Sequence, residues 1–304
     1  MNTELSVTLW PSFPHFPQFY RDPRISGIRL NSAMMSNPEL DKELEIVKSL
    51  DKDRLFFDIK GRQPRVVEIY PNKDHLDLKL NHPIEVQTPC VVLFKAGADF
   101  AILDHLEDGG QRLVFKGGPK YKVNPGESLH IRERDFKILG NLFTPEEVKK
   151  IEKVRKAGFK KYFLSYVESN NDVDQFFELV GRDAEVWLKI ENENGLKYVA
   201  DEFKKQDNLV LVAARGDLFV EIEKPHEIIH ALRLIIDTDP QACVGSRILL
   251  SVIDTPVPSC ADLLEIAWLH GIGYRKMMLC DELCLKENLL QTAVSVFDTV
   301  KNEL

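Results

Sequence analysis

Charged and amide side chains stand late in three short apolar segments, each with the length and composition of a β-strand. The pairs are Arg29 and Asn31 in GIRLN, Asp58 and Lys60 in LFFDIKG, and Lys189 and Glu191 in EVWLKIEN. Because alternate side chains of a strand share a face, each pair faces one way and the apolar residues face the other. A self-satisfied ring of interior salt bridges is one explanation, but burying charges is costly, which favours a functional site.

A fourth apolar segment, LVLVAA, is followed by Arg215, Gly216 and Asp217. A glycine lets the backbone approach a ligand closely, and consecutive backbone amides beside it suit a carboxylate group. Asp217 and Glu191 offer two hard oxygen ligands, which magnesium completes with substrate oxygens and water. We therefore expect these two carboxylates to hold Mg2+ or Mn2+.

The charges of this set predict an anionic ligand. Three groups are positive (Arg29, Lys60, Lys189) and three are negative (Asp58, Glu191, Asp217). One divalent ion would leave an excess of two positive charges, which a phosphorylated carboxylic acid offsets well.

Eight segments have strand composition, and amphipathic segments with helical periodicity follow most of them. The expected strands lie at 6–10, 27–31, 55–60, 162–167, 185–190, 209–214, 242–249 and 276–280. This alternation predicts an α/β fold, a (β/α)8 TIM barrel with its functional groups at the carboxyl ends of the strands. An open doubly wound sheet is the alternative, but the segment WPSFPHF lacks the glycine-rich turn that such a sheet normally has after its first strand.

The pattern of residue types is different between Arg65 and Glu133. Runs of β-branched and aromatic residues alternate there with turn signals, and helical periodicity is missing. This stretch predicts a small all-β domain inserted after the third strand. We expect residues 1–62 and 138–304 to form the barrel and residues 63–137 to form a β-barrel-like cap. His105 and His130 of the cap show no metal-ligand spacing and are interpreted as surface or packing residues.

Composition excludes several classes of protein. The chain has 304 residues and a formal net charge of −8, which argues against nucleic acid or an anionic membrane as the partner. Five cysteines without a Cys-x-x-Cys pair predict free thiols in a reducing compartment. The N-terminal residues lack the apolar run of a signal peptide, so we expect a cytoplasmic protein. The sequence leaves open whether it is a monomer or a homo-oligomer.

The chain resembles the pyruvate kinase family from about Ser6 to Leu283. The matching segments are GIRLN, FDIKG, LSYVESNNDV, LKIENENGL, ARGDLFVEI and GSRILLSVIDTPVPSCAD, in the family's order. In that family a small β domain is inserted after the third strand and closes over the active site. The resemblance implies phosphoenolpyruvate and pyruvate as substrates, with ADP and ATP as the nucleotides.

Several roles follow from this resemblance by position. Lys189 matches the lysine that stabilises the transferring phosphoryl group and the enolate oxygen, and Arg29 matches an arginine that contacts the phosphoryl group. Ser246 stands where the family has a threonine near the methylene carbon of the enolate. The expected substrate-binding residues are Lys60, Ala214, Arg215, Gly216 and Asp217.

The resemblance also implies two cation sites. Glu191 and Asp217 match the magnesium ligands of the family. Asn31 and Asp58 match two ligands of a monovalent cation, normally K+.

The chain departs from the family on the side that serves the nucleotide. A serine ligand of potassium is Ala33, an arginine after the fourth strand is Glu168, and the eighth strand ends in MLCDEL instead of Met-Leu-Ser-Gly-Glu-Thr. The family's C-terminal domain has no counterpart in these residues. Three hypotheses stay open: phosphoryl transfer, a lyase or aldolase that uses a pyruvate enolate, and a non-catalytic homologue that binds a metabolite.

Overall fold

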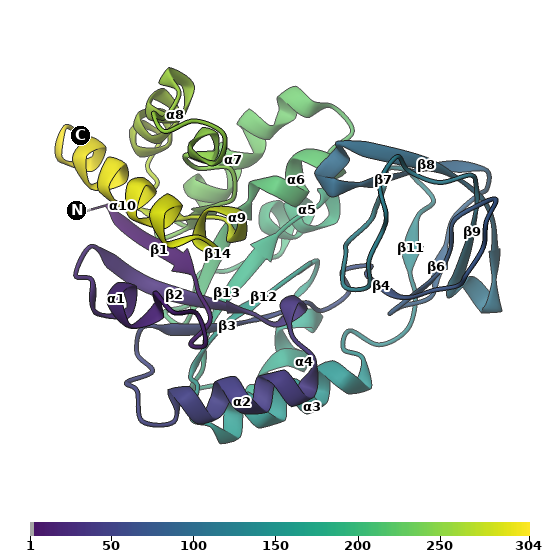
Figure 1. Ribbon diagram of the computed structural model, residues 1–304, viewed down its shortest axis with the longest axis horizontal. Helices are drawn as coiled ribbons and strands as arrows, with labels where there is room; N and C mark the ends of the chain where they lie inside the picture. Colours follow the sequence, from purple (N-terminus) through teal and green to yellow (C-terminus); the bar gives the residue numbers. More distant parts are fainter. Residues whose placement is uncertain (1–2) are drawn as a thin grey trace.

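Eight parallel strands form a closed barrel in the computed structural model, which describes residues 3–304 apart from the side chain of Met34. Around the barrel the order is β1, β2, β3, β12, β13, β14, β15 and β16 (Figure 1). Their bounds are Glu4–Thr8, Ile25–Asn31, Leu55–Ile59, Lys161–Leu164, Glu185–Ile190, Leu209–Ala214, Cys243–Gly245 and Lys276–Met278. The TIM barrel and all eight expected strands are confirmed.

The seventh strand, β15, is shorter than the expected range of 242–249. Ser246 and Arg247 follow it with φ angles of 68° and 64°, in the left-handed region that L-residues with side chains rarely adopt. This backbone cannot continue a strand, so the segment leaves the barrel at its carboxyl end.

Helices surround the barrel and cover its outer face (Figure 1). The longer ones are α2 (Asn37–Val47), α3 (Pro145–Lys156), α4 (Asn170–Val180), α5 (Glu193–Asp201), α7 (Ile228–Thr238), α8 (Cys260–Gly271) and α10 (Glu287–Asn302). The short ones are α1 (Phe16–Arg21), α6 (Arg215–Glu221) and α9 (Asp281–Cys284). Thr144 begins α3 with a capping box, in which its side chain accepts from Glu147 N. None of the described helices is long and apolar enough to cross a membrane.

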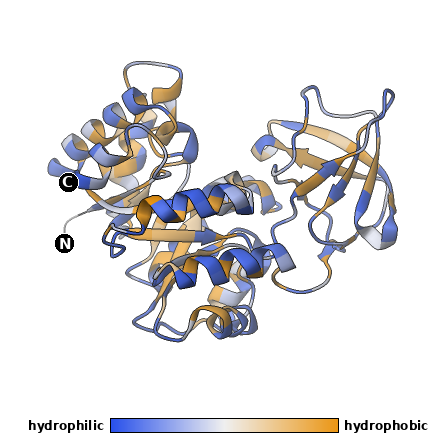
Figure 2. Cartoon of the chain, turned by 60° about the horizontal axis from the view of Figure 1, so that its bottom comes forward, coloured by the Kyte–Doolittle hydropathy of each residue, from blue (hydrophilic) through white to orange (hydrophobic). Residues whose placement is uncertain are grey.

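The barrel interior is filled at one level by aromatic, aliphatic and sulfur-containing side chains. This layer consists of Phe56, Phe163, Trp187, Val210, Val212, Cys243 and Met278. The alternating neighbours on β3, Leu55, Phe57 and Ile59, belong instead to the core between the barrel and its helices. Figure 2 shows the same division, with hydrophobic strands enclosed by helices whose outer faces are hydrophilic. The charged pairs of the sequence therefore share the inward face with this layer and lie farther along the strands.

The inserted domain leaves the barrel after β3 and returns before α3. Its larger sheet has the order β10, β7, β8, β9, β5 and β4, with antiparallel neighbours. The bounds in that order are His130–Ile131, Cys90–Phe94, Asp99–Glu107, Arg112–Lys116, Asp77–Leu80 and Val66–Ile69. A second sheet pairs β6 (Ile84–Glu85) with β11 (Lys137–Ile138). The all-β insertion after the third strand is thus confirmed, and we call it the cap.

Phe163→Ala tests the packing of the interior layer. Phe163 is 1% exposed and its ring centroid lies 5.1 Å from that of Trp187. Truncation removes buried contacts and leaves a void, so we expect a loss of about 3–5 kcal/mol in the free energy of unfolding. Urea denaturation followed by tryptophan fluorescence measures it. Phe100→Ala, at an exposed cap position, is the control and should change stability by less than about 0.5 kcal/mol.

Candidate active site

Asp58 lies at the centre of the charge cluster, at the carboxyl end of β3. Its Oδ2 atom is 2.7 Å from Lys60 Nζ, 3.7 Å from Arg29 Nε and 3.8 Å from Lys189 Nζ. The Asp58 side chain is completely buried. Burial acts to raise the pKa of Asp58, but the three cations outweigh it and hold the pKa well below its ordinary value. Asp58 is therefore an anion that holds together three cations from the carboxyl ends of β2, β3 and β13.

Lys189 extends this cluster toward the next carboxylate. Its Nζ atom is 2.8 Å from Glu191 Oε1 and donates to Ser165 Oγ at 3.0 Å. The other oxygen of Glu191 accepts from the backbone N–H of Tyr166 at 2.7 Å. Tyr166 has a φ of 53°, a strained backbone at the end of β12. The strain places its N–H where it fixes the Glu191 carboxylate.

Glu191 and Asp217 meet at the ends of the adjacent strands β13 and β14. Burial and the neighbouring charge of Asp217 raise the pKa of Glu191 to about 7, against the opposing effect of Lys189. The buried carboxyl group of Glu191 and the partly exposed one of Asp217 repel each other, and a divalent cation would relieve that repulsion. Among the described residues no group of three His, Cys, Asp or Glu side chains has metal-binding geometry. A site of two carboxylates would leave Mg2+ its other ligands from water and substrate, and Mg2+ binding at Glu191 and Asp217 stays a prediction.

The turn after β14 brings Gly216 beside Ser246. A Cβ atom added at Gly216 would lie 3.3 Å from Ser246 Oγ, so the glycine allows a close approach of these two segments. The side chain of Arg215 leaves the cluster: it forms an ion pair with Glu265 and donates to the carbonyl of Ser246. Ala214, Arg215 and Gly216 therefore offer the site their backbone.

The predicted monovalent-cation ligands, Asn31 and Asp58, are neighbours across β2 and β3. Their oxygens already have partners: Asn31 Oδ1 accepts from Ala33 N at 3.2 Å, and Asp58 Oδ2 contacts Lys60. A further cation here would lie near Arg29, Lys60 and Lys189, and K+ binding at Asn31 and Asp58 stays a prediction.

Asp281 is a site residue that the sequence reasoning missed. It follows β16 and its carboxylate is 2.7 Å from Arg29 Nη2 and accepts from Asn31 Nδ2 at 3.1 Å. The mouth of the barrel therefore holds four carboxylates and not the three expected. With a divalent ion bound, the excess of positive charge is one and not two. The rule that found Lys189, a charge near the carboxyl end of a strand, applies equally to Asp281 in MLCDEL.

His130 is a second missed residue, and it comes from the cap. It is 1% exposed, its Nδ1 is 2.6 Å from Glu221 Oε1 and its Nε2 is 3.5 Å from Asp217 Oδ1. Tyr166 donates to the same Glu221 oxygen at 3.0 Å. Burial acts to lower the pKa of His130, but the Glu221 hydrogen bond and the charge of Asp217 outweigh it and raise the pKa. No short-range pattern around His130 predicts this contact across two domains.

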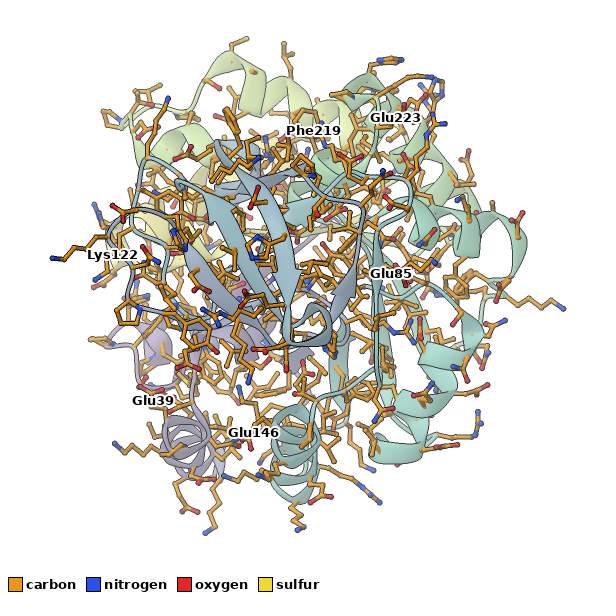
Figure 3. The ribbon with its side chains drawn as sticks, turned by 90° about the vertical axis from the view of Figure 1, so that its right-hand side faces the viewer. Glu39, Glu85, Lys122, Glu146, Phe219 and Glu223 are labelled. Carbon is orange, nitrogen blue, oxygen red and sulfur yellow. The ribbon has the colours of Figure 1, made fainter. Side chains whose placement is uncertain are left out.

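A cavity of about 720 Å³ opens beside this junction of cap and barrel. Tyr166 and Glu221 line it, together with Glu168, which lies 3.9 Å from Arg62. Burial raises the pKa of Glu168, although a hydrogen bond from Asn192 and the charge of Arg62 act in the other direction. Figure 3 views the molecule from the cap side, and Phe219 and Glu223, on and just after α6, lie along the upper edge of the cap in that view.

The chain forms a closed α/β barrel, and a buried cluster of cations and carboxylates lies at the carboxyl ends of its strands. TIM-barrel enzymes place their active sites at this end, so the fold and the cluster together are those of the TIM-barrel class. Comparison with curated proteins narrows the class. The chain is 25% identical to the pyruvate kinase of Methanocaldococcus jannaschii over 98% of its own length and 68% of that relative. It is 25% identical to the pyruvate kinase of Thermoplasma acidophilum over its whole length, and 28% identical to that of Thermotoga maritima over 78%.

These matches make the chain similar to pyruvate kinases along nearly its whole length. The chain spans only 59% and 51% of the Thermoplasma and Thermotoga enzymes, so it corresponds to part of each. No protein-family model matches it.

His130→Ala tests the link between cap and barrel. Removing the imidazole leaves the Glu221 carboxylate, whose side chain is 9% exposed, without its strongest partner. We expect a destabilisation of about 1–3 kcal/mol, measured by urea denaturation. His105→Ala, at an exposed position of the same domain, is the matched control and should have little effect. Equal stability of the two variants would show that the His130 contact contributes nothing.

Proposed function

We propose that this protein transfers a phosphoryl group between phosphoenolpyruvate and ADP, giving pyruvate and ATP, and that it does so in the cytoplasm. The observation that carries the proposal is the contact of Lys189 with Glu191 at 2.8 Å, beside Asp217 and the Asp58 cluster. A phosphoryl transfer needs positioned cations more than covalent help from the protein, and the cluster around Asp58 supplies them. The similarity to pyruvate kinases supports the same reaction.

In the proposed reaction the bond between phosphorus and the enol oxygen breaks, and a bond to a terminal phosphate oxygen of ADP forms. The electron pair stays on the enol oxygen, which the ammonium group of Lys189 stabilises. Arg29 orients the phosphoryl group, and the backbone from Ala214 to Gly216 holds the substrate carboxylate. The methylene carbon then takes a proton from a water molecule held by Ser246.

Glu191 and Asp217 would hold the divalent ion of this reaction. Bound there, Mg2+ would neutralise charge on the oxygens of the substrate. Ser165 and the Tyr166 N–H keep Lys189 and Glu191 in place, at 3.0 Å and 2.7 Å. Lys60 forms an ion pair with Asp58. Because Asp58 also contacts Lys189 and Arg29, this ion pair helps to fix the orientation of both.

A second candidate is a lyase or aldolase that forms a pyruvate enolate on the same pocket. The engagement of Arg29 by Asp281 and the negative charge of Glu168 favour it, because both weaken the binding of phosphate groups. Retro-aldol cleavage of a 4-hydroxy-2-oxo acid would then be the main activity.

Lys189→Ala tests the enolate chemistry that both candidates share. Without the ammonium group the enolate loses its buried cation, so proton exchange at the methyl group of pyruvate should fall by about 100-fold or more. Proton NMR in deuterated water with Mg2+ measures this exchange. Lys160→Ala removes a lysine whose side chain is 63% exposed and should leave the rate unchanged.

A coupled lactate dehydrogenase assay with phosphoenolpyruvate, ADP and Mg2+ tests the kinase reaction itself. Pyruvate formation that depends on ADP is the expected result. Proton exchange without such turnover, together with cleavage of a 4-hydroxy-2-oxo acid, would replace the kinase by the second candidate.

Glu191→Gln tests the metal site without relying on turnover. The amide keeps the shape of the side chain but lacks the charge, so Mg2+-dependent binding of oxalate should weaken by about tenfold or more. Isothermal calorimetry with and without Mg2+ measures the difference. Glu202→Gln, at an exposed position, is the control.

A further inference from the structure

Asp281 is bound to both polar side chains of β2 that face the barrel mouth. Its Oδ2 atom is 2.7 Å from Arg29 Nη2, and its Oδ1 atom accepts from Asn31 Nδ2 at 3.1 Å. The side chains of Arg29 and Asp281 are 8% and 30% exposed, so the aspartate is on the open side of the pair. Asp281 is therefore the member of the pair that solvent reaches more easily.

The remaining edge of the Arg29 guanidinium faces another carboxylate. Its Nε atom is 3.7 Å from Asp58 Oδ2 and has no hydrogen-bond partner among the described residues. An arginine binds carboxylate or phosphate best with two parallel donors, and here one of its Nη donors is already used. Arg29 still has free N–H donors for a second anion, but such an anion would lie beside the Asp281 carboxylate.

A phosphoryl group and a carboxylate make different demands on this end of the pocket. A phosphoryl dianion within hydrogen-bond distance of Arg29 would lie beside the ionised Asp281, and like charges at that separation repel. A small dicarboxylate would instead bind at Lys189 and at a divalent ion held by Glu191 and Asp217. Asp281 contacts Arg29 and Asn31 and does not contact Lys189, so it leaves this position open. The repulsion therefore acts on one class of ligand and spares the other.

We propose that Asp281 is a specificity-determining residue: it acts as an internal anion on Arg29 and Asn31 and disfavours phosphorylated ligands relative to unphosphorylated 2-oxo acids and their enolate analogues. The proposal rests on the proposed function, because it assigns the Arg29 end of the pocket to the phosphoryl group. A phosphorylated substrate then binds more weakly while the Asp281 carboxylate stays beside Arg29. Asp281 sets the balance between the two reactions considered above.

Asp281→Asn and Asp281→Gly separate the effect of the charge of Asp281 from the effect of the space that its side chain fills. The amide keeps the size of the side chain and removes its charge, whereas glycine removes the group altogether. Calorimetry with Mg2+ would measure two probes: 2-phosphoglycolate, which carries a carboxylate and a phosphate, and oxalate, which mimics the enolate without a phosphate. We expect 2-phosphoglycolate to bind about tenfold more tightly to both variants, while the affinity for oxalate changes less than about twofold.

Glu282→Gln is the matched control, because it removes a neighbouring exposed carboxylate that contacts neither Arg29 nor Asn31. It should leave the ratio of the two affinities as it is in the unchanged protein. Circular dichroism and thermal melting establish that the variants fold.

Three results would overturn the proposal: an unchanged ratio of affinities in both Asp281 variants, an equal gain for the two probes, or binding of neither probe by any form of the protein. The ratio is independent of turnover. A shifted ratio without ADP phosphorylation would retain the role of Asp281 and remove the kinase reaction. Phosphorylation of ADP with an unchanged ratio of affinities would retain the kinase reaction and remove the role of Asp281.

Discussion

The interaction on which the rest of the site depends is the contact of one buried carboxylate, Asp58, with three cations from different strands. Each of Arg29, Lys60 and Lys189 would be costly to bury alone, and they repel one another. Asp58 offsets both effects from a fully buried position at the end of β3. The closed barrel makes this arrangement possible, because it brings the carboxyl ends of β2, β3 and β13 to one rim. Without this anion the cationic pocket would not be stable in a low-dielectric interior.

Most of the fold could be predicted from the sequence, for physical reasons that particular segments illustrate. Alternation in LFFDIKG assigned Phe56 and Asp58 to the interior, and the structure places Phe56 in the aromatic layer and Asp58 beside the cations. The cap could be predicted because its β-branched runs lack helical periodicity. The short β15 could not, since the left-handed backbone that ends it occurs at Ser246 and Arg247, residue types that rarely adopt it, and not at a glycine.

The candidate site could be predicted where a charge follows a strand, and less well elsewhere. Lys189 and Glu191 lie together as their spacing on β13 indicates. The role of the Arg215 side chain depends on Glu265, a residue on a helix fifty positions away, and the sequence gives no sign of this ion pair. His130 reaches Glu221 only because the cap returns its strand β10 to α6, a tertiary contact that no local pattern encodes.

His130 on β10 connects the cap to Glu221, a barrel residue that lines the cavity between the two domains. Lifting the cap would expose Glu221 and Tyr166 to water in the same movement, so the free energy of opening includes the rupture of their shared contact with His130. Arg132, directly after β10, adds to this contact by donating to the backbone carbonyl of Val220. Two nearby residues of the cap therefore fasten the insertion to the single helix α6, and separating the two domains requires breaking both contacts.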